Sequence, residues 1–306
     1  MLEAVNLSRR YGDFTAVDDV SFSIQAGEIV GLLGHNGAGK TTIMKMLTGF
    51  LEPSSGKVSI AGEQVEANPL AAQRQLGYLP EALPVYPEMT VMQYLDYAAG
   101  MRGVPQQQRP AALARAVAAT ELGERATSTI ATLSRGFRQR VGVAQAIVHK
   151  PQYLILDEPT NGLDPAQTQQ MRTLIRSLAS EATVILSTHI MQEVDALCSR
   201  AIMLRGGQLV LDEVLNDRSK RGALRLRTTA RIEEVRRALE PLTAVVSPAE
   251  DELHIEIAST DDAACMKVSQ ALFEAGIPIA GLSVVKRDLE ALFREVNSEE
   301  SVNVAA

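Results

Sequence analysis

A glycine-rich loop directly after an apolar run constrains this chain more than any other feature. Residues 34–42 read Gly-His-Asn-Gly-Ala-Gly-Lys-Thr-Thr, and they follow the apolar residues 29–33. A glycine-rich turn at the end of a buried strand brings backbone N–H groups together around phosphate oxygens, and the following helix N-terminus adds partial positive charge. We expect Lys40 to reach the β- and γ-phosphates of a nucleotide, and the Thr41 hydroxyl to ligate Mg²⁺. The pattern therefore predicts a strand, a phosphate-binding loop and a helix over 42–51.

Apolar runs elsewhere predict the rest of an α/β core. The runs at 153–157 and 183–187 flank a predicted helix at 166–179. Such runs are typical of strands covered on both faces, so strand, helix and strand at this spacing predict a doubly wound parallel sheet. Residues 1–27 alternate apolar and polar positions, which predicts short antiparallel strands, and the alanine-rich residues 106–150 have a helical pattern.

The composition changes at residues 216–222, which are polar, charged and without periodicity, and we expect a domain boundary there. Beyond it, over 223–297, the pattern predicts the βαββαβ order of a small α+β ferredoxin-like domain, with segments at 224–229, 231–240, 243–247, 252–258, 261–275 and 277–286. A short helix at 288–296 and a disordered tail over 298–306 are expected to end the chain. The domain contains no Cys/His cluster and no second glycine-rich loop, which favours a dimerisation or docking role over a ligand sensor.

Charge and hydropathy limit the partners. The 306 residues carry a formal net charge of −7, so there is no basic field to attract a nucleic acid, and we expect no nucleic-acid partner. No apolar stretch approaches the roughly 20 residues that span a bilayer, and the first residues lack a signal-peptide pattern. Cys198 and Cys265 lie far apart without metal-ligand spacing, as expected of reduced thiols. We therefore expect a chain that stays in the cytosol.

Two adjacent carboxylates end the strand predicted at 153–157. Asp157 can hold Mg²⁺ or its water shell beside Thr41, and Glu158 is placed to accept a proton from an attacking water. The alternative is that Asp157 and Glu158 simply terminate a strand before Pro159. The complete phosphate loop upstream favours the catalytic interpretation.

The segment 133–140, Leu-Ser-Arg-Gly-Phe-Arg-Gln-Arg, completes an ordered series of motifs: Tyr11, residues 34–42, Glu81, residues 133–137, Asp157-Glu158, residues 162–164 and His189. Over residues 1 to about 220, this series resembles the ATP-binding subunits of ABC transporters. It looks most like those of bacterial ABC-2 type exporters, including gliding-motility and copper-maturation transporters. The resemblance implies a P-loop ABC ATPase domain over 1–220, with a mixed core sheet, an antiparallel β-subdomain and a helical subdomain.

The resemblance also implies roles for single residues. Lys40, Glu158 and His189 would be catalytic, with His189 contacting the γ-phosphate and holding Glu158 and the water. Mg²⁺ would meet Thr41, Asp157 and Glu81. ATP would meet Tyr11, whose ring stacks on adenine, together with Glu81 and the loop residues Gly34, His35, Asn36, Gly37, Ala38, Gly39, Lys40, Thr41 and Thr42.

The resemblance further implies a head-to-tail homodimer with two shared ATP sites. Ser134 and Gly136 would bind the γ-phosphate held by the second copy, and Asp164 would act across the dimer. Simpler interpretations stay open for single residues. Tyr11 can be a packing residue, and Asp164 can be a helix N-cap before Pro165.

Two positions depart from the family's pattern. Glu81 stands where the family usually has glutamine, and a carboxylate cannot donate hydrogen bonds at neutral pH. Arg135 and Phe137 stand in place of a glycine and a glutamine. Because Ser134 and Gly136 are retained, we still expect hydrolysis.

The resemblance implies an integral-membrane permease as partner, so the chain would be cytoplasmic and peripheral at the inner face of the cell membrane. Residues 86–103, rich in Met and Tyr, lie where a short cytoplasmic helix of the permease docks, and the alternative is a subdomain core. A rival function is a soluble cassette ATPase acting on nucleic acid or ribosomes. Those relatives usually carry two cassettes or a long coiled coil between the loop and the acidic strand end. Neither feature occurs here, which favours an ATPase that drives export.

Overall fold

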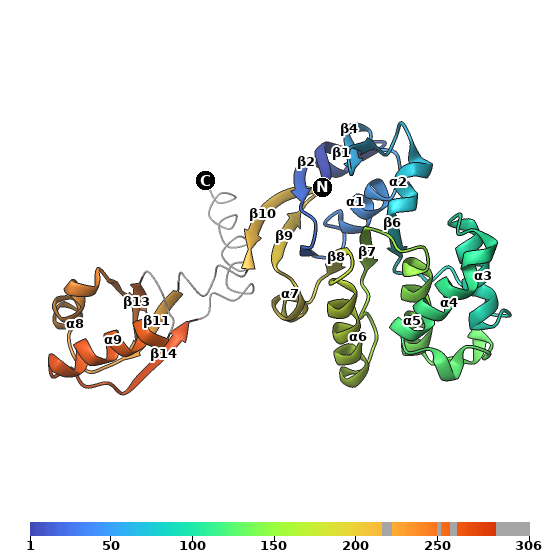
Figure 1. The fold of residues 1–306 in the computed structure, drawn as a ribbon. Helices are drawn as coiled ribbons and strands as arrows, with labels where there is room; N and C mark the ends of the chain where they lie inside the picture. The colour runs from blue at the N-terminus through green and yellow to red at the C-terminus, as the bar shows by residue number, and fades with distance from the viewer. Residues whose placement is uncertain (216–221, 250–251, 258–261, 286–306) are drawn as a thin grey trace. The chain divides into compact units, whose positions relative to one another are not determined.

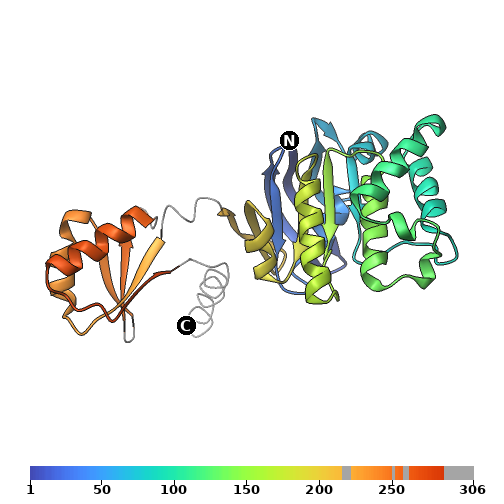
Figure 2. The same ribbon diagram turned by 60° about the horizontal axis from the view of Figure 1, so that its bottom comes forward.

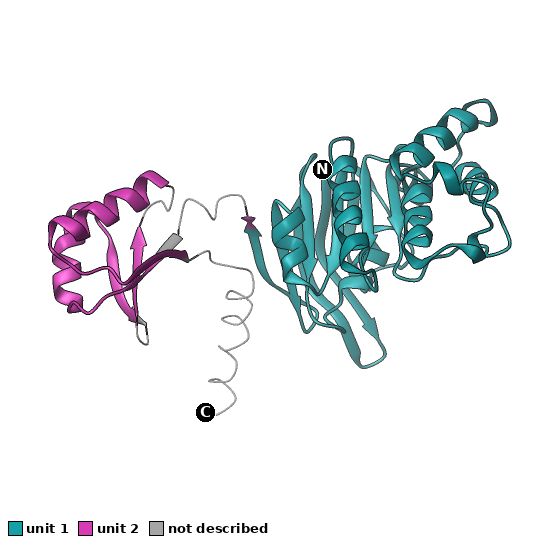
Figure 3. Ribbon diagram, turned by 90° about the horizontal axis from the view of Figure 1, so that it is seen from below, with its two compact units in different colours: residues 1–213 teal, residues 214–306 magenta. Residues whose placement is uncertain are grey.

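A computed structural model describes residues 1–215, 222–249, 252–257 and 262–285 (Figure 1). The predicted helix at 288–296, the predicted tail and most of the predicted boundary at 216–222 lie outside these residues. The chain divides into two compact units, residues 1–213 and 214–306 (Figure 3).

A six-stranded sheet with the order β10-β9-β3-β8-β7-β6 forms the centre of the first unit. Its strands are β3 (Ile29–Leu33), β6 (Leu76–Leu79), β7 (Tyr153–Asp157), β8 (Thr183–Thr188), β9 (Arg200–Arg205) and β10 (Gln208–Val214). The five strands from β9 to β6 pair in parallel. Every residue of β7 and β8 is buried, as expected of strands covered on both faces. The predicted α/β class is confirmed.

An antiparallel sheet with the order β2-β1-β4-β5 forms the second layer. Its strands are β1 (Leu2–Tyr11), β2 (Phe14–Ile24), β4 (Ser55–Ile60) and β5 (Glu63–Gln64). The prediction of short strands at the start of the chain was wrong, since β1 and β2 have 10 and 11 residues. Register shifts between Ala4 and Arg10 interrupt the alternation, so one long hairpin has the sequence pattern of several short strands.

Helix α1 (Lys40–Leu47) lies between these two sheets (Figure 1). Its buried residues Ile43 and Met46 belong to one apolar cluster that also includes Val20 of the antiparallel sheet and Ile155 of the parallel sheet. The helix follows β3 directly through the glycine-rich loop. The core therefore fixes the loop at the carboxyl end of a central strand.

Other helices cover the remaining surfaces of the parallel sheet. Helix α2 (Pro69–Gln75) precedes β6, and α6 (Pro165–Leu178) and α7 (Met191–Leu197) follow β7 and β8. Helix α7 packs directly on β3, because a Cβ at Gly31 would lie 2.9 Å from the methyl groups of Val194. Since the neighbouring Leu32 belongs to the cluster around α1, α7 lies on the opposite face of the sheet.

A helical layer lies beside the β6 edge of the sheet (Figure 2). It comprises α3 (Val91–Met101), α4 (Arg109–Ala119) and α5 (Arg135–Ile147), with 3-10 turns at Gln106–Gln108, Gly123–Arg125 and Ile130–Thr132. The helical pattern over 106–150 is thus several helices that share their own apolar cluster. Helix α5 reaches the sheet where Gly77 of β6 leaves room for the backbone of Ala146.

The second unit is an antiparallel sheet with the order β12-β13-β11-β14. Its described elements are β11 (Gly222–Arg227), α8 (Ile232–Leu239), a 3-10 turn at Glu240–Leu242, β12 (Val245–Ala249), β13 (Glu252–Ile257), α9 (Asp262–Glu274) and β14 (Gly281–Val285). All three strand pairs are antiparallel. Leu224, Ile255, Val235 and Leu272 bury the faces that the sheet and the two helices turn toward each other. The βαββαβ order with this strand arrangement is the ferredoxin-like fold.

Candidate active site

The loop between β3 and α1 has a shape that only glycine permits at its end. Gly39 has a φ of 102°, and a Cβ there would lie 2.7 Å from the carbonyl oxygen of Ala16. The next residue, Lys40, is buried, and its Nζ donates to the carbonyl oxygens of Gly34 (2.7 Å) and His35 (3.1 Å). Burial lowers the pKa of Lys40, while the nearby carboxylate of Glu158 acts in the opposite direction.

The carboxylate of Asp157 lies at the end of β7, close to the start of α1. The Ser187 hydroxyl donates to its Oδ1 at 2.5 Å and accepts the backbone N–H of Glu158 at 2.9 Å. The Thr41 hydroxyl lies 3.5 Å from the same Oδ1. Asp157 Oδ2 is buried and has no hydrogen-bond partner among the described residues. An orphaned carboxylate oxygen of this kind is suited to a bound cation or a cation's water shell.

Glu158 and His189 form a close pair. The Glu158 side chain is buried. Its backbone lies in the left-handed region (φ 49°), a conformation found often at functional sites. His189 Nδ1 lies 3.2 and 3.1 Å from the two carboxylate oxygens. Because an ionised carboxylate only accepts, Nδ1 carries the proton in this contact. Burial raises the pKa of Glu158 against the opposing effects of His189 and Lys40, which makes its carboxylate a stronger base.

A cavity of about 400 Å³ opens beside the loop. It is lined by predicted residues together with Phe14 and Ala16, namely Tyr11, Phe14, Ala16, Asn36, Gly37, Gly39, Lys40, Thr41, Thr42, Glu81 and Glu158. Gly34, His35 and Ala38 do not line it: two of them offer carbonyl oxygens to Lys40, and Ala38 is buried in the core. The structure thus brings the N-terminal hairpin, the loop and the acidic strand end around one space.

The wall opposite the loop carries two exposed aromatic side chains. Tyr11 is 47% exposed, with the guanidinium of Arg9 4.7 Å from its ring centre. Phe14, three residues further along the hairpin, is 63% exposed and lines the same cavity. Sequence reasoning missed Phe14, and its signal was its place beside Tyr11 across the turn at Gly12. It also missed Ser187, whose hydroxyl joins Asp157 to Glu158.

The remaining predicted residues lie around a second cavity of about 370 Å³. Ser134, Gly136 and Asp164 line it, and among the residues that the structure describes it shares none with the cavity beside the loop. Ser134 caps α5 by accepting from the N–H of Phe137 at 3.4 Å, and Asp164 caps α6 by accepting from Gln167 at 2.8 Å. The N-cap alternative for Asp164 is therefore observed, and a single chain does not bring this group to the loop.

Arg135 and Glu81, which depart from the family's pattern, both contact Asn161. The Arg135 guanidinium donates to the carbonyl oxygen of Asn161 at 2.7 Å, and the side-chain amide of Asn161 lies 3.5 Å from Glu81 Oε1. The arginine therefore holds the start of α5 to the turn that precedes α6. Sequence reasoning gave Arg135 no such contact.

These residues fit a nucleotide with its magnesium ion. The loop ends in a buried lysine, the start of α1 offers the Thr41 hydroxyl, and the end of β7 offers the orphaned Oδ2 of Asp157. In the part of the chain that the structure describes, no group of three or more His, Cys, Asp or Glu side chains could hold a metal by itself. Mg²⁺ takes few protein ligands and keeps waters and phosphate oxygens as the others, so the oxygens of Thr41 and Asp157 are a donor set of the right kind.

A parallel sheet with this loop, an antiparallel layer, a helical layer and an acidic strand end define a P-loop ATPase of the cassette type. The sequence model described as ABC transporter matches residues 17–161. The chain belongs to the ABC transporter family as one of its ATP-binding subunits, an ATPase that drives a membrane transporter.

Individual relatives agree with this assignment. The chain is similar to the Nod factor export ATP-binding protein I of Burkholderia orbicola (strain AU 1054), with 36% identity over 208 residues, which is 68% of each chain. It is 35% identical over 223 residues to the bacitracin transport ATP-binding protein BcrA of Bacillus licheniformis, 72% of each chain. A solved ATP-binding subunit of an ABC transporter superposes with a TM-score of 0.65 at 32% identity, covering 71% of this chain and 91% of that one. None of the described helices is both long and apolar enough to cross a membrane.

Proposed function

We propose that two copies of this chain bind two ATP molecules between them and power export through an integral-membrane permease. The observation that carries the proposal is the separation of the two halves of the site. One chain supplies the loop and Glu158 around one cavity, and Ser134 and Gly136 around another. A head-to-tail pair unites the halves twice, because each chain contributes a different half to each site.

In this arrangement, Ser134 and the N-terminus of α5 bind the γ-phosphate held by the other copy. Ser134 is exposed, and the start of α5 carries no acidic residue that would repel a phosphate. Asp164, at the N-terminus of α6 beside the same cavity, lies at the proposed contact between the copies. Arg135 keeps the two helix starts together through Asn161.

Magnesium is proposed to bind at Thr41 and Asp157, with Glu81 acting through a bound water. The ion supplies positive charge that neutralises the β- and γ-phosphates. Lys40 exchanges its carbonyl partners Gly34 and His35 for phosphate oxygens and adds a second positive charge. Ser187 holds Asp157 Oδ1, which leaves the buried Oδ2 available as a ligand that would bind the cation or its water shell.

Glu158 is the proposed general base. It accepts a proton from water while the water oxygen attacks the γ-phosphorus and the bond to the bridging oxygen of ADP breaks. His189 positions Glu158 through its Nδ1 contact with the carboxylate. In its doubly protonated form the ring also donates to the γ-phosphate from Nε2. Tyr11 stacks on the adenine at the exposed side of the cavity.

The permease is proposed to dock in a groove of about 410 Å³ beside α3. The predicted docking segment divides here into two sets. Tyr94 is buried in the helical layer and donates to the carbonyl oxygen of Pro84, as a core residue does. Met101, 72% exposed, lines the groove with Tyr86 and Tyr97, and Phe50, which lies outside the predicted segment and is 76% exposed, lines it too. Adaptable methionine and aromatic surface suits an apolar helix of a membrane partner, which would hold the chain at the inner face of the membrane.

We also propose that the two predicted domains have different roles. Domain 1–220 binds and hydrolyses ATP, and domain 223–297 stabilises the dimer or the docked complex. Deletion of 223–297 is expected to weaken assembly with the permease. The proposal fails if the shortened chain assembles normally but loses a response to a small molecule.

The central test uses Glu158→Gln, which keeps the shape of the side chain but cannot accept the proton. With ATP and Mg²⁺, light scattering after size exclusion should show a stable dimer that hydrolyses ATP at least about 100-fold more slowly, the lower end of a general base's contribution. Lys40→Ala is the matched control, expected to stay monomeric. Normal turnover by Glu158→Gln would refute the base assignment, and a monomer with ATP bound would refute the shared site.

A further inference from the structure

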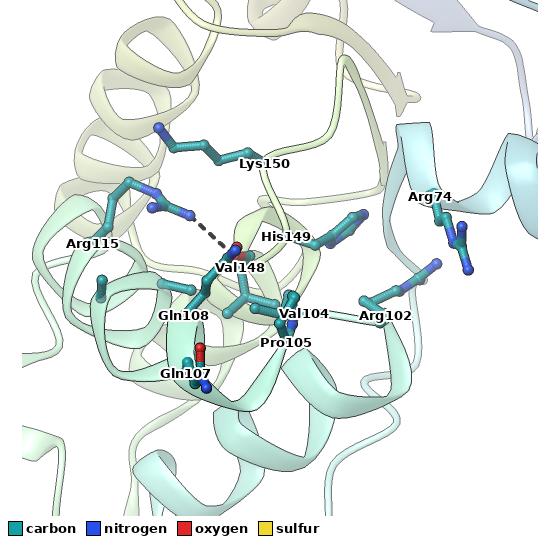
Figure 4. A pocket seen from close by; sticks show the side chains of 13 residues that line it. Arg74, Arg102, Val104, Pro105, Gln107, Gln108, Arg115, Val148, His149 and Lys150 are labelled. Atoms are coloured by element: carbon teal, nitrogen blue, oxygen red, sulfur yellow. Dashed lines mark hydrogen bonds between the residues drawn. The ribbon is translucent and has the colours of Figure 1, made fainter.

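A cavity of about 600 Å³ lies at the junction of α2, the α3–α4 connection and the segment that joins α5 to β7 (Figure 4). Among the residues that the structure describes, it shares none with the nucleotide cavity. Figure 4 shows Arg74 and Arg102 at one end, Arg115 and Lys150 at the other, and the ring of His149 between them. The proposed nucleotide chemistry uses none of these five side chains as a ligand.

The cavity is strongly cationic. None of the described residues that line it is acidic, and none of its four cations forms an ion pair with a described residue. Among the described residues, Arg102 and Arg115 donate to the carbonyl oxygens of Gln73 (3.3 Å) and Val148 (3.2 Å), which are neutral acceptors. Four positive charges around one space repel each other unless an anion enters it.

One carboxylate lies near two of these cations without forming an ion pair with them in the described part of the chain. Arg115 and Lys150 also border an adjacent cavity of about 270 Å³ that Glu181 lines. Within the described part of the chain, Glu181 forms no ion pair with either side chain. Burial also lowers the pKa of Arg102, because the charged guanidinium is partly removed from water.

His149 adds a buried polar atom that meets no partner. Its Nε2 lies 3.0 Å from the carbonyl oxygen of Leu76 and must donate to it, which leaves a lone pair on Nδ1. That Nδ1 is buried without a hydrogen-bond partner among the described residues. Burial and the nearby cation Arg102 lower the pKa of His149 to about 4, so the ring is neutral at pH 7. The neutral ring therefore lines the cavity without adding a fifth positive charge.

We propose that this cavity is a binding site for a phosphate-bearing anion, with Arg74 and Arg102 taking oxygens at one end and Arg115 and Lys150 at the other. Guanidinium groups match phosphate oxygens in pairs, and a lysine adds a mobile point charge. The space exceeds what a single phosphate fills, so the ligand is a pyrophosphate or a phosphate group carrying an organic body. Because Arg102 also lines the groove beside α3, occupancy would fix one side chain of that groove.

The test measures pyrophosphate binding by isothermal titration calorimetry at low salt, in the full chain carrying Lys40→Ala so that the nucleotide loop does not compete. Arg74 and Lys150 are exposed, and within the described residues neither side chain makes a hydrogen bond that folding could depend on. Arg74→Gln and Lys150→Gln should each raise Kd about 10-fold, the loss of one charge-assisted hydrogen bond. Lys57→Gln, which removes an exposed cation on β4, is the matched control and should leave Kd unchanged.

A second arm separates the two sources of the phosphate. Flotation with phosphatidylcholine vesicles containing phosphatidic acid, against phosphatidylcholine alone, should show Arg74-dependent binding if the phosphate belongs to a lipid headgroup, and none if the ligand is soluble. The proposal is overturned if neither pyrophosphate nor phosphatidic acid binds. It is equally overturned if Arg74→Gln and Lys150→Gln behave like Lys57→Gln.

Discussion

Replacing Ser187 with alanine should destabilise the first unit far more than the loss of an exposed serine hydroxyl does. The buried hydroxyl donates to Asp157 at 2.5 Å and accepts from the N–H of Glu158 at 2.9 Å. A hydrogen bond to a carboxylate contributes about 1.5–3 kcal/mol, and a neutral one about 0.5–1.5 kcal/mol. The expected loss is therefore about 2–4 kcal/mol of the free energy of unfolding.

Differential scanning calorimetry measures this loss as a shift of the first unit's transition. For a unit of this size, about 1 kcal/mol lowers Tm by about 2–4 °C, so Ser187→Ala should lower it by roughly 4–16 °C. Ser180→Ala is the matched control, because that hydroxyl is exposed and donates only to the carbonyl of Ser177. A shift no larger than that of the control would mean that Ser187 does not hold the two carboxylate residues. The proposed role of Ser187 in orienting Asp157 would then be wrong.

Three further outcomes are expected. Gly39→Ala should abolish ATP binding in equilibrium dialysis because its Cβ would lie 2.7 Å from Ala16 O, whereas Gly37→Ala, which meets open space, should be milder; equal effects would contradict the steric argument. Tyr11→Ala should raise the Kd for ATP roughly 5- to 150-fold and Tyr11→Phe hardly at all, since base stacking contributes about 1–3 kcal/mol per ring. In phosphate-free buffer, Tm should fall more steeply for the native chain than for His149→Gln between pH 7 and pH 5. The pKa of His149 is about 4 in the folded state and 6.5 in an unfolded chain, so the unfolded state binds more protons as the pH falls. The free energy of unfolding should therefore fall by about 2 kcal/mol between pH 7 and pH 5. Parallel plots of Tm against pH for the two chains would refute this.

Much of the fold could be read from local patterns. The apolar runs at 153–157 and 183–187 are β7 and β8, and the alternation at 252–258 is β13. These segments are predictable because a strand's burial on one or both faces determines the pattern of consecutive residues. The hairpin β1–β2 was misjudged because its bulges break the alternation, although they leave the strand pairing intact.

The site was predictable where its chemistry is local, and not where it depends on distant contacts. Lys40, Thr41, Glu81 and Glu158, which the motifs singled out, line one cavity, and their roles there stay predictions. The contact of Arg135 with Asn161 spans 26 positions, and the hydrogen bond of Ser187 with Asp157 spans 30. No period or spacing encodes such pairs, because only the pairing of β7 with β8 and the packing of α5 decide them.

The sequence by itself determined the class of this protein. Residue type and order were enough to predict it from three motifs: the loop at 34–42, the acidic strand end and the segment at 133–140. The tertiary structure decided which of these residues line the same cavity. It places Ser134 and Gly136 at a cavity that shares no described residue with the cavity beside the loop. It also gathers Arg74, Arg102, Arg115 and Lys150 around a space that no sequence motif predicted. The physical reason is the range of the interactions. Backbone conformation and phosphate chemistry depend on neighbouring residues, whereas a cavity and its charge are made by elements that meet only when the chain is packed.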